Sequence, residues 1–420
     1  MTGLWLEPRT GRGFGLVTAT TDVHSALGRA ASLAACIHSL REQDALIADC
    51  GDFLEGSGYY LLGHGETEIA LLRGLYHVAA PGNHGYRHHA DDAALAAITV
   101  CANVTGPGGA TAWPPLKLAR VAGRTVAVTA VMSEEAFASI PPGQRNGHRV
   151  TEPAQALHAL HRRHGGQADS WVVLSHSGFA SDMSLAAACP FLDVVFSGHC
   201  HSPDYGPAAV GETTVVKGAE LGAGYASARP GSGRRWQAGT HLVPPQAGPP
   251  PGHLLDALAN ADVLRRELEK PVGPVREEFA GRSPNRHGLL SRLAPLALAA
   301  TGARAVMLNV TCLREVSLGP VLTGGDLMDA EPFGNTLTCV ITRDLGTLAA
   351  RLRERCGELA CYPQPLPAGG EPARVAVTSY LAATHLAGCD LVTSVPGGSQ
   401  AETGLSLRAL LRGLLLAPGR

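Results

Sequence analysis

The sequence predicts an α/β protein with two domains. From Phe14 to about Val243, short apolar or β-branched runs alternate with Ala- and Leu-rich stretches that have helical spacing. The segment 242–253 then contains five prolines, which is typical of a linker. A second alternation of strands and helices follows it. A chain of 420 residues is long enough for two domains of ordinary size.

These changes in pattern divide the chain into three parts. We expect a first domain over residues 1–243, a linker with a connecting helix over 244–272, and a second domain over 273–420. The connecting helix is predicted from HLLDALANADVLRRELEKPVG, and the second domain's strands from AVMLNV, TLTCVITR and ARVAVTSYL.

The predicted strands of the first domain end in polar loops. Five runs share this shape: FGLVTATTDVH, DALIADCGD, LYHVAAPGNH, WVVLSHSG and LDVVFSGHCH. A continuous apolar run bounded by Gly, Asp or His is typical of a strand that is buried on both faces. In open α/β sheets, functional residues lie beyond the carboxyl ends of such strands. We therefore expect the functional residues in these five loops.

Composition excludes several classes of protein. The formal net charge is −2, from 34 Lys+Arg against 36 Asp+Glu, so no surface for a nucleic acid polymer is expected. No apolar run reaches the ~18 residues of a membrane span, and MTGLWLEPRT lacks the regions of a signal peptide. We expect a cytoplasmic protein with a small-molecule partner and no membrane contact. The sequence leaves the oligomeric state open.

Cysteine and histidine have different roles here. The ten cysteines form no CxxC pair, which argues against a zinc ribbon or a disulfide framework and favours buried, free thiols. The 18 histidines are unusually many, and several of them lie in the five loops.

The five loops carry oxygen and nitrogen ligands. Asp, Asn and His suit Mn, Zn, Fe or a similar divalent ion, and the lack of Cys argues against a thiolate site. In an extended segment, residues i and i+2 point to the same side, so DxH and HxH can hold one cation or flank two. A carboxylate can bridge two cations about 3.5–4 Å apart. The candidate ligands are Asp22, His24, Asp52, Asn83, His176, His199 and His201, with His84 beside Asn83.

The ordered series DVH, GDFLEG, GNH, LSHSG and GHCH resembles the calcineurin-like metallophosphoesterase superfamily, whose pattern is DxH, GDxxxG, GNH, a lone H and GHxH. The resemblance covers roughly residues 14–230. It implies a four-layer α-β-β-α sandwich with two divalent metal ions, and His84 as the catalytic histidine that binds no metal. It places Asp22, His24, Asp52 and His201 on one metal, and Asp52, Asn83, His176 and His199 on the other.

Elementary chemistry agrees with this resemblance. Two cations would lower the pKa of a bridging water, orient a phosphate ester and stabilise the charge that develops on its oxygens. A histidine beside them could protonate the leaving alkoxide. We therefore expect hydrolysis of a phosphate ester by a hydroxide that bridges the metals.

The second domain narrows the expected substrate. The stretch MLNVTCLREVSLGPVLTGGDLMDAEPFGNTLTCVI resembles the C-terminal domain of the 5′-nucleotidase family, in which an Asn-to-Arg segment leads to PFGN. The resemblance implies a smaller α/β substrate-binding domain. Asn309 and Arg314 would contact the polar part of a nucleotide, while Phe333 and Tyr380 would clamp the base. Arg282 is a further candidate for a phosphate contact.

The sequence departs from the nucleotidase pattern in three places. The family follows GNH with an acidic residue and then FD, but Gly85 and Arg87 stand there. Either an acid such as Asp91 or Asp92 assists His84, or this histidine works unassisted. The family's GGDG is missing from SYLAATHLAGCDL, and Asp390 is not a clear substitute for its aspartate. The chain is also shorter than most members.

The sequence thus predicts a metal-dependent phosphoric monoester hydrolase with two metal ions. Its expected substrate is a nucleoside 5′-monophosphate or a related nucleoside-like phosphate ester. The alternatives are a 2′,3′-cyclic nucleotide phosphodiesterase and a phosphatase of a specialised metabolite that is not a nucleotide. A protein that binds a ligand without catalysis remains a further alternative.

Overall fold

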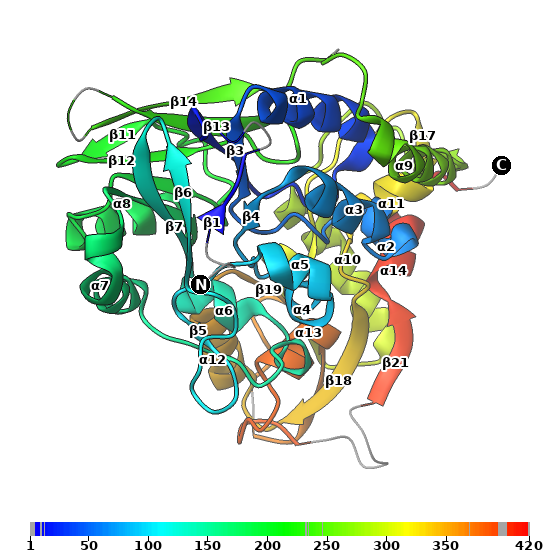
Figure 1. Cartoon of the computed structure of the whole chain (residues 1–420). Helices are drawn as coiled ribbons and strands as arrows, with labels where there is room; N and C mark the ends of the chain where they lie inside the picture. The colour runs from blue at the N-terminus through cyan, green and yellow to red at the C-terminus, as the bar shows by residue number, and fades with distance from the viewer. Residues whose placement is uncertain are drawn as a thin grey trace. The chain divides into compact units, whose positions relative to one another are not determined.

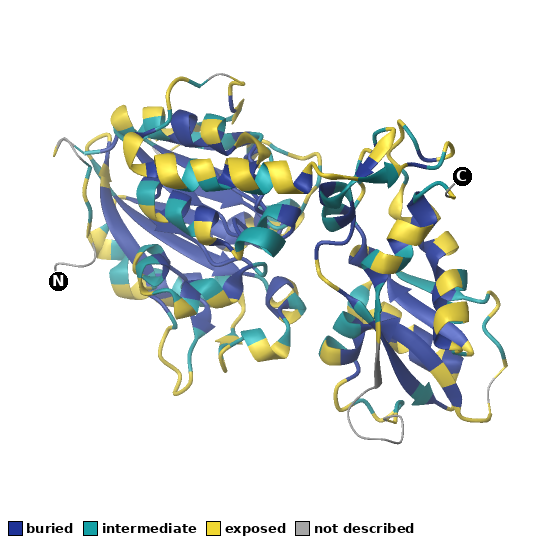
Figure 2. Ribbon diagram, turned by 90° about the vertical axis from the view of Figure 1, so that its right-hand side faces the viewer, coloured by how far each residue is buried: buried dark blue, intermediate teal, exposed yellow. Residues whose placement is uncertain are grey.

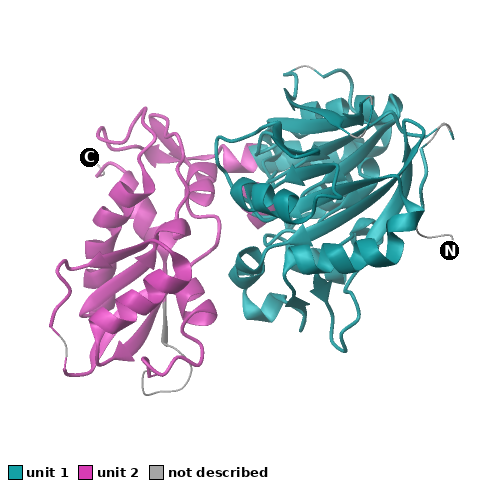
Figure 3. Cartoon of the chain, turned by 90° about the vertical axis from the view of Figure 1, so that its left-hand side faces the viewer, with its two compact units in different colours: residues 1–55, 62–265 teal, residues 56–61, 266–420 magenta. Residues whose placement is uncertain are grey.

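The protein divides into two compact units (Figure 3). The computed structural model describes residues 5–8, 11, 13–231, 233, 235–245, 247–368, 370–393 and 401–418. Unit 1 contains residues 1–55 and 62–265, and unit 2 contains residues 56–61 and 266–420. The division at 265/266 falls inside the stretch expected to hold the linker and the connecting helix. The assignment of 56–61 to unit 2 was not expected, and the finer limits 1–243 and 273–420 stay predictions.

Unit 1 is built on two β-sheets (Figure 1). One sheet has seven strands in the order β1-β6-β7-β9-β10-β12-β11, and the other has five in the order β14-β13-β2-β3-β4. The strands of the first sheet are β1 (Trp5–Leu6), β6 (Leu116–Val121), β7 (Arg124–Met132), β9 (Ser170–His176), β10 (Val194–Ser197), β11 (Ala208–Val210) and β12 (Thr213–Lys217). Those of the second are β2 (Leu16–Thr20), β3 (Ala45–Asp49), β4 (Val78–Ala79), β13 (Gly224–Pro230) and β14 (Trp236–Leu242).

The two sheets pack face to face through alternate residues of their strands. Val17 and Ala19 of β2 and Leu46 of β3 share one buried cluster with Val172 of β9 and Phe196 of β10. Because successive side chains of a strand point to opposite faces, the residues between them face away from this core. Ile47 and Val173 are such residues, and both are fully buried as well. Burial on both faces explains why the strands read as continuous apolar runs.

Helices cover the outer face of each sheet. Leu157 and Leu160 of α7 (Pro153–His164) and Leu185 of α8 (Phe179–Ala188) pack with Val173 and Val195 of the seven-stranded sheet. Helices α1 (Ala30–Glu42) and α3 (Glu66–Leu75) lie along the five-stranded sheet (Figure 1). The expected four-layer α-β-β-α sandwich is therefore confirmed.

Shorter elements complete unit 1. Helix α7 begins after Glu152, whose carboxylate caps it by accepting hydrogen bonds from the N–H groups of Ala154 and Gln155. The other elements are α4 (Tyr86–Asp91), α5 (Ala93–Ile98), α6 (Glu134–Ser139), β5 (Val104–Thr105), β8 (Arg149–Val150) and the 3₁₀ turns at Leu27–Arg29, Pro142–Gln144, Gly165–Gln167 and Gly252–Leu254. Helices α2 (Gly58–Gly63) and α9 (Leu255–Leu268) cross the limits between the units.

Unit 2 has three layers around a sheet in the order β19-β16-β20-β18-β21. Helices α10 and α14 pack on one face of this sheet, and α12 and α13 on the other. Its strands are β15 (Pro271–Pro274), β16 (Ala305–Asn309), β17 (Val321–Thr323), β18 (Thr336–Thr342), β19 (Leu359–Tyr362), β20 (Ala373–Thr378) and β21 (Ala401–Ser406). Its helices are α10 (Arg286–Thr301), α11 (Gly324–Ala330), α12 (Leu345–Cys356), α13 (Ser379–Thr384), α14 (Leu407–Leu415) and the 3₁₀ turn Val310–Cys312. The smaller α/β second domain is confirmed.

Burial follows the strands and the inner faces of the helices in both units (Figure 2). All ten cysteines are free thiols and most are buried, as expected. Within the described residues, no helix combines the length and the apolar character that crossing a membrane requires.

Truncation of a core side chain should selectively destabilise unit 1. Leu46 is fully buried between the sheets, so Leu46→Ala should lower the free energy of unfolding by about 2–5 kcal/mol. All four tryptophans lie in unit 1, and their fluorescence during urea unfolding reports on that unit. Leu242→Ala is the matched control, since Leu242 is 73% exposed and its loss should cost less than about 0.5 kcal/mol. Equal effects of the two substitutions would contradict the assigned core.

Candidate functional site

Five loops of unit 1 converge at the carboxyl ends of parallel strands. Strands β2, β3 and β4 run parallel in one sheet, as do β9 and β10 in the other. Backbone bonds join the first two loops: the N–H of Asp22 donates to the Gly51 carbonyl (3.1 Å), and the N–H of His24 donates to the Asp52 carbonyl (2.8 Å). The loop after β10 joins them through the N–H of His199, which donates to the Asp22 carboxylate (3.0 Å). The fold thus brings the polar strand ends together.

Several of these loop residues have a left-handed backbone. The φ angles are 49° at Asp22, 51° at His24, 57° at Asp52 and 78° at His199. Non-glycine residues in this region carry an energetic cost of order 1–3 kcal/mol each, and such residues concentrate at functional sites. The surrounding hydrogen bonds hold the four residues in this conformation, which turns their side chains toward a common point.

Glycines make room for this convergence. A Cβ atom at Gly82 would lie 2.0 Å from Oδ1 and 2.2 Å from the backbone nitrogen of Asp52. A Cβ atom at Gly51 would lie 2.7 Å from Nδ1 of His176. Neither neighbour can move without displacing the site, so the glycines of GNH and CGD are required for close approach of the loops.

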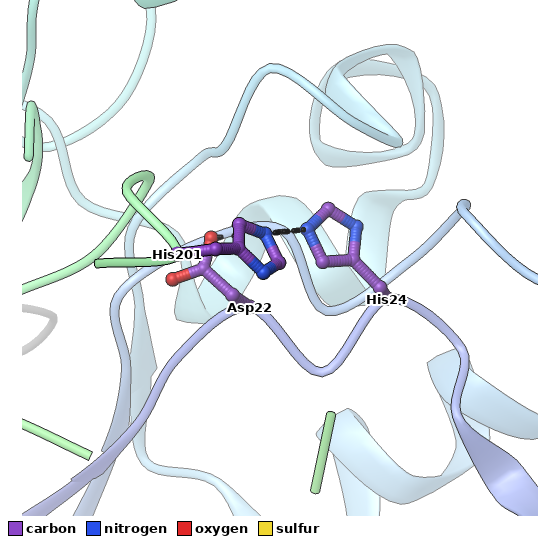
Figure 4. Close-up of side chains that lie close together, drawn as sticks. All are labelled: Asp22, His24 and His201. Carbon is purple, nitrogen blue, oxygen red and sulfur yellow. Dashed lines mark hydrogen bonds and ion pairs between the residues drawn. The ribbon is translucent and has the colours of Figure 1, made fainter. Parts of the chain in front are cut away.

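Asp22, His24 and His201 form the first group of candidate ligands (Figure 4). Nε2 of His24 lies 3.1 Å from Nε2 of His201 and 3.9 Å from Oδ1 of Asp22. The two imidazoles face each other through these nitrogens. Either one N–H donates to the lone pair of the other nitrogen, or both lone pairs are directed at a cation. Asp22 and His24 are buried, whereas His201 is exposed.

Asp52, His176 and His199 form the second group. Nε2 of His176 lies 3.3 Å from Oδ1 of Asp52 and 3.0 Å from Oδ1 of Asn83. Nδ1 of His176 lies 2.8 Å from the Cys50 carbonyl and therefore carries the hydrogen, which leaves the Nε2 lone pair for a cation. Asp52 also approaches the first group, because its Oδ2 is 3.7 Å from Nε2 of His24.

His84 lies beside both groups and, with His24 and Asp52, forms a third group whose ligand atoms are close enough together to hold a cation. Its backbone N–H donates to Oδ1 of Asp52 (2.8 Å), and its ring centroid is 4.9 Å from that of His24. Its side chain is 23% exposed, so a molecule from solvent can reach it. The structure therefore brings all eight residues that the sequence predicted in unit 1 into one place.

The electrostatics of the cluster fit divalent cations. Burial raises the pKa of Asp22 to about 6, and the negative charge of Asp52 contributes to the increase. Burial lowers the pKa of His199 to about 3, which keeps its ring neutral, as a metal ligand must be. Burial alone would lower the pKa of His176, but the negative charge of Asp52 raises it to about 9, so the buried carboxylates draw positive charge into the cluster. The donor set of oxygen and nitrogen atoms suits Mn, Zn, Fe or a similar ion.

Lys217 supports the GHCH loop and was missed by the sequence analysis. This lysine is fully buried at the end of β12, and its ammonium group donates to the carbonyls of Cys200 (2.9 Å) and Ser202 (2.7 Å), on either side of His201. Its charge is balanced by an ion pair with Glu220. A lone lysine at a strand end belongs to no motif, so only the structure could reveal this role.

The acid beside His84 is Glu55, not Asp91 or Asp92. Asp91 pairs with the exposed Arg87 at 3.0 Å, and Asp92 caps helix α5 by accepting hydrogen bonds from two backbone N–H groups. Oε2 of Glu55 lies 3.6 Å from Nδ1 of His84. Burial opposes ionisation of Glu55, but His84 and the N–H of Gly85 hold the pKa of its carboxyl below the ordinary value. Glu55 lies inside GDFLEG rather than after GNH, so the position of the family's acid in the sequence does not point to it.

In unit 2, the PFGN turn is joined to the start of helix α13. The buried Glu331 carboxylate accepts hydrogen bonds from the N–H groups of Gly334 (3.2 Å) and Asn335 (2.8 Å). The Asn335 side-chain oxygen accepts hydrogen bonds from the Ser379 hydroxyl (3.4 Å) and the N–H of Tyr380 (3.3 Å). Through Asn335, the backbone segments that carry the two predicted aromatic residues are held in a defined arrangement.

The predicted aromatic and cationic residues of unit 2 remain accessible. Phe333 is 41% exposed, and the guanidinium carbon of Arg314 lies 5.8 Å from the centroid of its ring. Arg314 also donates to the Gly56 carbonyl at 3.1 Å. The ring of Tyr380 is partly exposed and contacts His385 edge to face. These residues offer aromatic faces and a positive charge to a ligand.

Asn309 is placed differently from the other predicted residues. It is 3% exposed at the end of β16, where its amide nitrogen donates to Thr311 and its oxygen accepts from the Thr378 hydroxyl, each at 2.9 Å. Its contact with a substrate therefore stays a prediction. Arg282 and Asp390 are both exposed, and the phosphate contact of Arg282 stays a prediction as well.

Comparison with known proteins supports the fold. No family model matches the chain, and no curated protein matches it in sequence. Among solved structures, a 5′-nucleotidase precursor from Thermus thermophilus is 18% identical with a TM-score of 0.73, over 96% of this chain and 97% of that chain. A 5′-nucleotidase from Candida albicans is 14% identical with a TM-score of 0.68, over 96% and 98% of the two chains.

A third similar structure is that of a protein with a different named activity. The sulfate thiohydrolase SoxB from Thermus thermophilus is 16% identical with a TM-score of 0.70, over 93% of this chain and 81% of that chain. Across nearly its full length, the chain thus has the two-domain fold of the 5′-nucleotidases, as the sequence motifs predicted. Because one fold serves more than one reaction, the activity must be argued from the site.

The carboxylate of Asp52 should be essential for metal binding, because it approaches both groups of ligands. Asp52→Asn should remove most of the Mn²⁺ that the unaltered protein retains after loading and gel filtration, as measured by elemental analysis. Asp204→Asn makes the same change on an exposed residue near the GHCH loop and should retain the metal. Full metal retention by Asp52→Asn would show that Asp52 is not a ligand.

Proposed function

We propose that this protein is a metal-dependent phosphohydrolase that releases phosphate from a nucleoside 5′-monophosphate or a related nucleoside-like phosphate ester. The observation that carries the proposal is the placement of Asp52 within 4 Å of His24 and His176, one from each ligand group, with His84 alongside. A carboxylate shared by two ligand groups is the arrangement that two adjacent cations require.

The ligand groups support two metal positions. Asp22, His24, Asp52 and His201 would hold one divalent ion, and Asp52, Asn83, His176 and His199 would hold the other. Such ions, when bound, supply an activated water and positive charge for the phosphate oxygens. Lys217 and the backbone bonds between the loops keep the ligands in place before a substrate arrives.

His84 would act on the leaving group. In the proposed reaction, the oxygen of a deprotonated water forms a bond to phosphorus while the bond between phosphorus and the ester oxygen breaks. The proton that the water loses passes to solvent, and solvent later returns one to His84. The products are an alcohol and inorganic phosphate, and the alcohol oxygen receives its proton from His84. An alkoxide is a poor leaving group, so this proton transfer matters most for esters of aliphatic alcohols such as the nucleoside 5′-hydroxyl.

Unit 2 would recognise the nucleoside part. Phe333 and Tyr380 offer aromatic faces for a base, and Arg314 offers a guanidinium group for phosphate or ribose oxygens, with Asn309 as a further candidate. The segment after Tyr380 favours an unusual substrate as the second candidate. The family's GGDG is missing from SYLAATHLAGCDL there, and Asp390 is exposed. A 2′,3′-cyclic nucleotide or a phosphate ester that is not a nucleotide would be compatible with the loss of this segment.

Phosphate release from a panel of substrates tests the proposal. The panel contains nucleoside mono-, di- and cyclic phosphates and an aryl phosphate, each with Mn²⁺-loaded and metal-stripped protein. We expect metal-dependent release that is fastest with nucleoside 5′-monophosphates. Release from the aryl phosphate alone would assign unit 2 to a different substrate, and no release from a metal-replete protein would favour a non-catalytic binding protein.

Loss of either aromatic residue should weaken nucleotide recognition selectively. Phe333→Ala and Tyr380→Ala should each raise KM for the preferred nucleotide by about 10-fold, the equivalent of one lost aromatic contact of ~1.4 kcal/mol. Hydrolysis of a small aryl phosphate should stay within about twofold. Val321→Ala, at a similarly exposed apolar residue of unit 2, is the matched control. Equal loss on both substrates would rule out a base clamp.

A further inference from the structure

His84 lacks the acid that the nucleotidase family's pattern has after GNH. The residue three positions on is Arg87, whose side chain is 63% exposed and pairs with Asp91. Gly85, which directly follows His84, cannot be replaced by an acidic residue without strain. Its φ is 66°, and a Cβ atom there would lie 2.5 Å from Cβ of Leu54. Any carboxylate for His84 must therefore come from another loop.

Glu55 supplies a carboxylate from the loop after β3. Its Oε2 lies 3.6 Å from Nδ1 of His84, and the two side chains are similarly accessible at 25% and 23%. The same carboxylate accepts a hydrogen bond from the N–H of Gly85. A side chain at Gly85 would disturb this arrangement. A glycine at position 85 is therefore compatible with an acid for His84 that comes from the loop after β3.

The backbone of Glu55 also contacts a residue of the site. Its carbonyl oxygen lies 3.3 Å from Nδ1 of His24, a candidate metal ligand. Its φ is 62°, the left-handed conformation that costs energy for a residue with a side chain. This backbone conformation allows the carbonyl to reach His24 while the carboxylate reaches His84, so one residue contacts both histidines.

We propose that Glu55 is a positioning residue for His84, whose ring it holds with Nδ1 facing its carboxylate. A carboxylate at Nδ1 keeps one hydrogen on that nitrogen, so the second proton of the imidazolium form, the one given to the leaving oxygen, is on Nε2, which points away from Glu55. His84 then presents Nε2 to the leaving oxygen in one orientation instead of several. The inference rests on the proposed phosphohydrolase function, and it assigns to Glu55 no contact with substrate or metal.

A comparison of two leaving groups tests this role. Glu55→Ala should lower kcat about 10–100-fold on a nucleoside 5′-monophosphate, which needs a proton donor, but less than about threefold on p-nitrophenyl phosphate, which does not. KM and bound Mn²⁺ should be unchanged. Glu55→Gln keeps an accepting oxygen and should recover part of the rate. Asp91→Asn is the matched control, since it alters a surface acid of the neighbouring segment, and it should behave like the unaltered protein.

A double variant separates positioning from a merely structural contribution. Glu55→Ala should cause no further loss in kcat when His84→Asn is already present, because residues that act as one unit are not additive. In metal-free protein, ¹⁵N spectra of the histidine rings should show His84 protonated at Nδ1, and a mixture of tautomers in Glu55→Ala. The His84→Asn spectrum assigns the signal.

The outcomes are distinguishable. If the unaltered, metal-loaded protein hydrolyses neither ester, the proposed function fails and this inference fails with it. If it hydrolyses both, three results would overturn the role of Glu55 alone: equal losses on the two esters, additive losses in the double variant, or an unchanged His84 tautomer in Glu55→Ala. If Glu55→Ala does not fold, Glu55→Gln, which has nearly the same shape, decides the matter by its losses on the two esters and by their additivity with His84→Asn.

Discussion

Convergence of two buried carboxylates on the same imidazole is the constraint on which the rest of the site depends. Nε2 of His24 lies within 4 Å of both Asp22 and Asp52, and both acids are at most 2% exposed. Like charges buried this closely repel each other and are poorly solvated, so the arrangement is stable only with compensating positive charge. The left-handed residues and the required glycines are consequences of bringing these groups together.

The sheets provide the rigidity that this convergence needs. Strands that are buried on both faces cannot shift without moving the whole core, so the loops start from defined points. Bonds between loops then set the remaining geometry: the N–H of His199 holds Asp22, the N–H of His84 holds Asp52, and Lys217 holds the carbonyls around His201. Hydrogen bonds within unit 1 therefore orient the candidate ligands.

The candidate residues of unit 2 are accessible, unlike most of the ligands of unit 1, and buried residues beneath them fix their positions. The buried Glu331 and Asn335 hold the PFGN turn and the start of α13, while Phe333 and Tyr380 remain accessible. Substrate choice can change at such a surface without disturbing the buried supports. Two proteins of similar fold, a 5′-nucleotidase and a sulfate thiohydrolase, are named for different activities, which is consistent with this separation.

The sequence by itself determined the α/β class and the identity of the candidate ligands. Buried parallel strands and their polar carboxyl ends are local patterns, so Asp22, Asp52 and His176 could be found without coordinates. Only the tertiary structure decided which side chains support them. Glu55 and His84, or Lys217 and Cys200, meet because loops distant in sequence approach each other, and Asn309 is buried because two strands of unit 2 pair beside it. Such contacts depend on distances across the fold, which no local pattern records.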